Sequence, residues 1–105
     1  MTSVLVEDGD LVLDVAARTA TRAGEALHLT AREFDLLCHF VTHPDTVLSR
    51  EDLLREVWGW SFGDDSTVTV HVRRLREKVE ADPGHPTRLV TVWGLGYRWN
   101  PTPAG

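Results

Sequence analysis

The chain has 105 residues, of which 42% are hydrophobic and 26% are charged. That length predicts one domain whose single core needs no metal or disulfide to hold it together. The lone Cys38 excludes an internal disulfide and fits a reducing compartment. There is no signal-peptide pattern, and no apolar run approaches the roughly 20 residues that cross a bilayer. We therefore expect a soluble, cytoplasmic protein with no membrane partner.

The net charge of −5 is distributed unevenly along the chain. Residues 1–65 hold five arginines and 13 acidic residues, a net charge of −8. Residues 66–105 hold six basic and three acidic residues, a net charge of +3. An acidic body with a basic C-terminal third favours binding of a polyanion on one side only.

The N-terminal 29 residues predict a sheet. Glycine, aspartate and alanine turn signals at 8–10, 16–18 and 23–25 separate short aliphatic or alternating segments. The expected strands are Val4–Val6, Leu11–Val15, Thr19–Arg22 and Ala26–Leu29. Such spacing is typical of an antiparallel meander, which either supports helices or docks a partner.

Two helices are expected next. Thr30 and Glu33 form a capping box, and the broad apolar face that follows predicts the most buried helix, ending near His43. Ser49 is a good N-cap for a second helix from Arg50 to about Val57, which Gly59 stops. The loop Trp58–Asp64 (WGWSFGD) holds three aromatic residues between glycines. These aromatic side chains either fold back on the core or form a surface for a partner.

Residues 65–81 carry the most informative pattern. Asp65 is the expected N-cap, and an apolar stripe recurs at helical spacing, consisting of Val68, Val72, Leu75 and Val79. The opposite direction holds Thr67, Val70, Arg73 and Arg74. Such an outer face suits a DNA major groove, but a solvated helix with a basic face has the same pattern. Residues 82–86 then break the chain, residues 89–100 predict a glycine-turned hairpin, and 101–105 predict a tail.

Five collinear motifs carry a resemblance to a known family. They are LTAREFDLL at 29–37, VLSREDLLREVWG at 47–59, TVTVHVRRLREKVE at 67–80, DPGHP at 82–86 and LVTVWGLGYRW at 89–99. Over about residues 4–100 the chain closely resembles the winged-helix effector domain of OmpR/PhoB-type response regulators. The resemblance implies an α+β winged helix-turn-helix fold, with an N-terminal four-stranded antiparallel sheet, a three-helix core and a C-terminal β-hairpin wing.

The resemblance also implies a function in bacterial two-component phosphorelay signalling. The expected function is sequence-specific binding of double-stranded DNA to regulate transcription, with helix 66–81 in the major groove and wing 89–100 near the minor groove. Protomers of such domains, monomeric alone, commonly pair on direct-repeat half-sites. A receiver domain with a phosphorylatable aspartate belongs to such proteins, and 105 residues do not hold one as well. Two alternatives remain, a protein-interaction module and the winged helix of a non-phosphorylated activator.

Site residues follow by position from the resemblance. The DNA-contacting set is Trp58, Ser66, Thr67, Val70, His71, Arg73, Arg74, Arg76, Thr91, Trp93 and Tyr97. The loop that engages RNA polymerase in family members corresponds to Trp60, Ser61, Phe62, Gly63 and Asp64. Ser66 and Trp93 stand where the family often has arginine, and Thr69 where it often has aspartate. The two lost charges predict weaker non-specific binding. Trp93 either contacts sugar or the minor groove, or packs on the base of the wing.

No metal, cofactor or enzymatic activity is expected. His39 and His43 lie four residues apart beside Cys38, but no further ligand cluster completes a metal site. The glycines at 94 and 96 precede no helix and so do not form a phosphate-binding loop. No hydrolase, zinc-protease or nucleotide-binding motif occurs.

Overall fold

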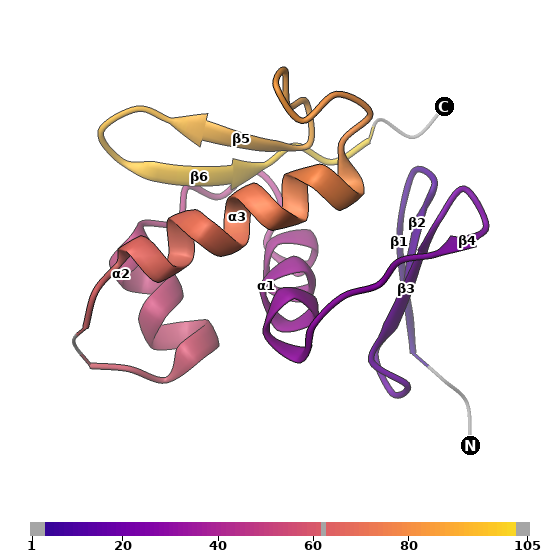
Figure 1. The fold of residues 1–105 in the computed structure, drawn as a ribbon, viewed down its shortest axis with the longest axis horizontal. Coiled ribbons are helices and arrows are strands. Elements are labelled where there is room, and N and C mark those ends of the chain that lie inside the picture. Colours follow the sequence, from indigo (N-terminus) through magenta and orange to yellow (C-terminus); the bar gives the residue numbers. More distant parts are fainter. Residues whose placement is uncertain (1–3, 62, 103–105) are drawn as a thin grey trace.

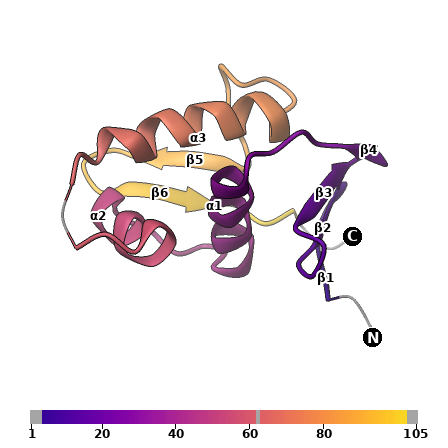
Figure 2. The ribbon, with the colours of Figure 1, turned by 60° about the horizontal axis from the view of Figure 1, so that its bottom comes forward.

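The computed structural model describes residues 4–61 and 63–102 and shows the expected winged helix (Figure 1). An N-terminal sheet stands at one end of the molecule, α1 lies in the middle, and α3 runs across α1. The C-terminal hairpin lies alongside α3 in both views (Figure 2). The predicted α+β architecture is confirmed. Within the described ranges, no helix is both long enough and apolar enough to cross a membrane.

The N-terminal sheet is an antiparallel meander in the order β1-β2-β3-β4. Its strands are β1 (Leu5–Asp8), β2 (Leu11–Asp14), β3 (Thr19–Arg22) and β4 (Glu25–Ala26). Leu11, Leu13 and Ala20 face the core, as alternation along a half-buried strand requires. β4 is shorter than predicted. After Ala26 the Leu27 amide still donates to the Ala20 carbonyl of β3, and the chain then leaves toward α1.

All three helices follow their predicted N-cap residues, and in two of them the cap side chain bonds to the first turn. The helices are α1 (Ala31–Thr42), α2 (Arg50–Leu53), continued by the π-helical segment η1 (Leu54–Trp58), and α3 (Ser66–Val79). Thr30 and Glu33 form the expected capping box on α1, and Ser49 with Asp52 forms another on α2. Gly59 ends η1 in the left-handed conformation.

Helix α3 starts at the predicted residue, but its N-cap side chain does not cap it and the helix ends earlier than predicted. The Asp65 side chain makes no capping bond, because the Asp65 backbone is already helical (φ −71°, ψ −5°). The carboxylate of Asp64 instead accepts the Ser66 amide hydrogen at 2.9 Å. At the other end Glu80 is extended, so the helix stops at Val79 rather than at residue 81.

The hairpin consists of β5 (Leu89–Val92) and β6 (Gly96–Trp99), paired antiparallel. On its other edge β6 exchanges two backbone hydrogen bonds with Leu48, from the Tyr97 amide at 2.9 Å and to the Tyr97 carbonyl at 2.8 Å. Gly96 is required at this crossing. A Cβ on it would lie 2.1 Å from the Leu48 oxygen, and its φ is +150°.

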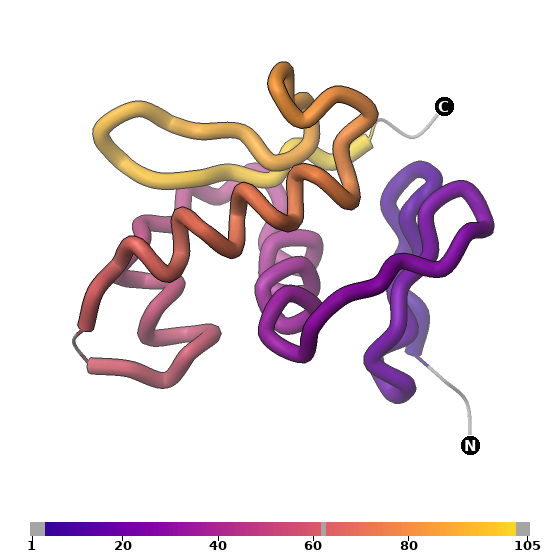
Figure 3. Tube along the Cα trace, in the orientation of Figure 1, coloured from indigo at the N-terminus to yellow at the C-terminus, as the bar shows by residue number. Residues whose placement is uncertain are grey.

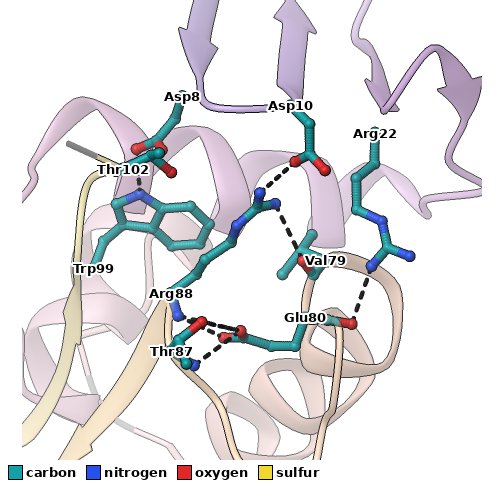
Figure 4. Close-up of polar contacts among 9 residues, drawn as sticks. All are labelled: Asp8, Asp10, Arg22, Val79, Glu80, Thr87, Arg88, Trp99 and Thr102. Atoms are coloured by element: carbon teal, nitrogen blue, oxygen red, sulfur yellow. Dashed lines mark hydrogen bonds and ion pairs between the residues drawn. The ribbon is translucent and has the colours of Figure 1, made fainter. Parts of the chain in front are cut away.

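Polar contacts join the N-terminal sheet to the C-terminal half of the chain (Figure 4). The Trp99 indole and the Thr102 amide each donate to the buried Asp8 carboxylate at 2.8 Å. Arg88 pairs with Asp10 beside them. Thr102, which the sequence places in a tail, is therefore held against the N-terminal sheet. The tube view shows the end of the chain after β6 close to this sheet (Figure 3).

Candidate nucleic-acid interface

Helix α3 has a buried stripe, an outer face and two flanks that contact other elements. Its predicted stripe is buried in the core and consists of Val68, Val72, Leu75 and Val79. The opposite side points outward and carries Arg73, Arg74 and Val70, the last 43% exposed. Ser66 is exposed at the first turn, and Thr67 is half-buried. Glu77 is also exposed on this outer side, so the face is basic with one carboxylate.

One flank of α3 packs on the other helices. His71 lies edge-on to the Trp58 ring, with centroids 5.1 Å apart, and its Nδ1 is 2.7 Å from the Thr67 carbonyl. Trp58 is buried, and the Arg32 guanidinium lies 5.6 Å over its ring. Trp58 thus belongs to the core, and a contact from its indole to a phosphate stays a prediction. Near the C-terminal end of α3, on the same flank, the Lys78 ammonium pairs with the Glu33 carboxylate at 2.5 Å.

The other flank of α3 is fastened to the wing by Arg76. Its Nε donates to the Leu89 carbonyl at 2.9 Å, and its Nη2 donates to the Thr91 hydroxyl at 2.8 Å. The guanidinium also lies 5.7 Å over the ring of the buried Tyr97. Burial lowers the pKa of Arg76 from its usual value. Three residues that were predicted to contact DNA therefore contact one another, and direct contacts from them to DNA stay predictions.

A groove runs between α3 and the wing. It is lined by Arg50, Thr69, Arg76, Thr91, Val92, Trp93, Gly94, Leu95, Gly96 and Tyr97. The sequence reading did not assign Arg50 to the interface. The Arg50 side chain lies 3.4 Å from Asp65, the residue predicted as a cap, and this ion pair holds α2 beside the start of α3. The sequence feature that could have indicated Arg50 is its place as the first residue of the helix that precedes the basic helix.

Trp93 stands at the tip of the wing. The turn Val92–Leu95 is closed by a 3.0 Å bond from the Leu95 amide to the Val92 carbonyl, with Gly94 at φ +80°. Trp93 is 90% exposed, which rules out the alternative that it packs on the base of the wing.

The aromatic residues of segment 58–64 follow both predicted alternatives, packing on the core or exposure to a partner. Trp58 folds into the core, whereas Trp60 is 46% exposed and borders a shallow pocket together with Ser61 and Gly63. Asp64 is exposed, and the hydrogen bond from the Ser66 backbone amide lowers its pKa. Phe62 lies outside the described residues.

His39 and His43 are the two residues that the sequence offers as candidate metal ligands. Their rings stack with centroids 4.2 Å apart, and His43 Nδ1 is 2.7 Å from the His39 carbonyl. In the part of the chain that the structure describes, no group of three or more His, Cys, Asp or Glu side chains is arranged to hold a metal ion.

Comparison with known proteins gives consistent matches. A family model described as "Transcriptional regulatory protein, C terminal" matches residues 24–99. The transcriptional regulatory protein YvrH of Bacillus subtilis is 51% identical over 83 residues, which cover 78% of this chain and 35% of YvrH. The chain thus spans about a third of that relative's length.

Two solved structures share the fold. The response regulator DrrB of Thermotoga maritima, an OmpR/PhoB homologue, matches with a TM-score of 0.83 and 31% identity, covering 91% of this chain and 44% of DrrB. The RstA DNA-binding domain of Klebsiella pneumoniae in complex with the RstA box matches with a TM-score of 0.85 and 32% identity. That match covers 92% of this chain and 97% of the RstA domain.

Proposed function

The chain belongs to the family of C-terminal DNA-binding domains of OmpR/PhoB-type two-component response regulators, and from this we propose that it binds double-stranded DNA sequence-specifically to regulate transcription. The family consists of DNA-binding domains of transcriptional regulators and not of enzymes, as the sequence predicts. A crystallised relative with the same fold is bound to its DNA site, which supports the proposal. The place of action would be the bacterial cytoplasm, where the chromosome lies.

The observation that carries the proposal is the division of α3 into a buried stripe, two flanks and an outer face. One flank is bonded to the wing through Arg76 and the other packs on Trp58, while the stripe is buried. The outer face, with Val70, Arg73 and Arg74, is exposed, so it can meet a partner. Arginine forks take guanine edges or phosphates, and a valine methyl contacts a thymine methyl. We assign this face to the major groove and the wing to the neighbouring minor groove.

The proposed partners extend beyond DNA. We expect two protomers on direct-repeat half-sites, monomeric when free. Because the relatives are longer than this chain, we also propose a receiver domain in the full-length protein. RNA polymerase is the proposed partner of loop 60–64, and the exposed Trp60 ring supports that assignment.

Titration of the protein into a random-sequence duplex tests the proposal. We expect binding that weakens as salt rises, with a log–log slope of about −0.9 for each phosphate contacted. Salt-insensitive binding, or none at low salt, would contradict DNA binding and favour the protein-interaction alternative. Selection of bound sequences from a random library then yields the operator, and an unselective pool would contradict sequence specificity.

A further inference from the structure

The tip of the wing is apolar and lies in solvent. Trp93 is 90% exposed and Leu95 is 64% exposed, and residues 89–97 contain no charged side chain. A tryptophan and a leucine held together in water lose the hydrophobic stabilisation that burial would give each of them. Neither side chain supports the core. The tip therefore has the composition of a contact surface rather than of a structural turn.

The tip is also held in a fixed position. Gly96 lies against Leu48, and the two backbone hydrogen bonds between Leu48 and Tyr97 fix β6 to the segment before α2. Arg76 fixes β5 to α3 through its bonds to Leu89 and Thr91. Because the backbone beneath the tip is already held, binding at the tip costs little backbone conformational entropy.

Positive charge lies beside this apolar tip. The groove that runs from the tip to α3 is lined by Arg76, whose hydrogen bonds go to uncharged oxygens, and by Arg50, which pairs with Asp65. An apolar protrusion flanked by cations fits the DNA minor groove, whose base edges lie between two rows of phosphates. Thr69 and Arg76 of α3 line the same groove as the tip, so the tip lies beside the helix that is proposed to hold the DNA.

We propose that Trp93, with Leu95 beside it, enters the minor groove as an apolar wedge that partly unstacks a base step. This inference rests on the proposed function, because it places the tip on DNA that α3 already holds. Unstacking costs least at flexible pyrimidine–purine steps. The wing then selects operators by deformability, at positions that α3 does not read.

Affinity measurements on a random-sequence duplex provide the first test. Loss of aromatic stacking in Trp93→Ala should weaken binding about tenfold. The salt slope should stay unchanged, because an apolar contact releases no counterion. Trp93→Arg should instead steepen the slope by about 0.9. Leu95→Ala should weaken binding less than Trp93→Ala, and Leu5→Ala, a leucine 54% exposed on β1, is the matched control and should change nothing.

Parallel selections from a random library with the wild-type protein and Trp93→Ala provide the second test. Wild-type pools should carry a pyrimidine–purine step about five base pairs from the bases that α3 reads, half a helical turn away. Trp93→Ala pools should keep the α3 bases and lose that step. Unchanged affinity in Trp93→Ala, a shallower salt slope, or identical pools would overturn the wedge alone. Absence of duplex binding by the wild-type protein would overturn the proposed function and the wedge with it.

Discussion

At the scale of single residues, position on the helix decides what each arginine of α3 does. Arg76 faces the wing, where its guanidinium bonds to Leu89 and Thr91. Arg73 and Arg74 are exposed on the outer face. The sequence places all three in one DNA-contacting set, because residue type and helical period do not reveal where the wing packs. Of the three, Arg74 is the side chain that we expect to read a base.

Replacement of Arg74 tests that expectation. If its guanidinium takes a base edge, Arg74→Ala should cost about 1–3 kcal/mol on the library-selected operator and little on random DNA. The measurement is a pair of binding isotherms at one salt concentration. Arg55→Ala, on the exposed side of η1, is the control and should affect neither. Equal losses on both duplexes would show that Arg74 contacts a phosphate.

At the scale of elements, local signals predict this fold well. Both capping boxes, the buried stripe of α3 and the glycine-turned hairpin follow from residues close together in sequence. The end of α3 and the role of the Asp65 side chain depend on residues elsewhere in the chain. Glu80 leaves the helix because its carboxylate accepts amide hydrogens from Thr87, Arg88 and Leu89 across the turn. The Asp65 side chain, which does not cap α3, pairs with Arg50. Sequence patterns alone do not reveal such contacts.

The site was predicted less well than the fold, for a similar reason. The outer face of α3 follows from helical periodicity. The contacts of Arg76 with Thr91 and Tyr97 depend on how the wing packs against α3. The burial of Trp58 likewise depends on His71, 13 positions along the chain. The sequence does not determine the exposure of Trp93, because a side chain in a turn can point toward the core or toward solvent.

The bond between α3 and the wing should be measurable as a coupling energy. Arg76→Ala removes both charged hydrogen bonds and should lower the free energy of unfolding by about 2 kcal/mol. Thr91→Val should cost less, since it removes one acceptor. In the double variant the second change should cost at least about 0.5 kcal/mol less than it does alone. Urea unfolding of the four proteins gives the cycle, and additive losses would contradict the bond.

At the scale of the whole molecule, buried carboxylates join parts that are far apart in the sequence. Glu33 connects α1 to α3 through Lys78, and Asp8 connects β1 to β6 through Trp99. Burial alone raises the pKa of both carboxyls. For Glu33, hydrogen bonds from Lys78 and the Thr30 amide outweigh burial and hold the pKa below its ordinary value of 4.5. For Asp8, hydrogen bonds from Thr102 and Trp99 hold the pKa below 3.8.

These two pKa values predict how stability depends on pH. A carboxyl whose pKa is depressed by folding stabilises the protein above its unfolded pKa, and this stabilisation is lost as pH falls through the folded value. The free energy of unfolding in urea should therefore be level near neutrality and fall as pH drops below about 4.5.

The Glu33→Gln variant separates the Glu33 share of this acid sensitivity from the rest. It leaves Lys78 without its charged partner, which should lower the free energy of unfolding by about 2 kcal/mol at neutral pH. This loss is smaller than for a fully buried pair because the Lys78 side chain is partly exposed. Glutamine does not titrate, so the variant should lose less stability on acidification and its curve should approach that of the wild type. Glu7→Gln, on the exposed side of β1, should leave both features unchanged. Parallel curves for Glu33→Gln and the wild type would show that the pair with Lys78 does not set the acid response, and would assign the loss to other carboxyls such as Asp8.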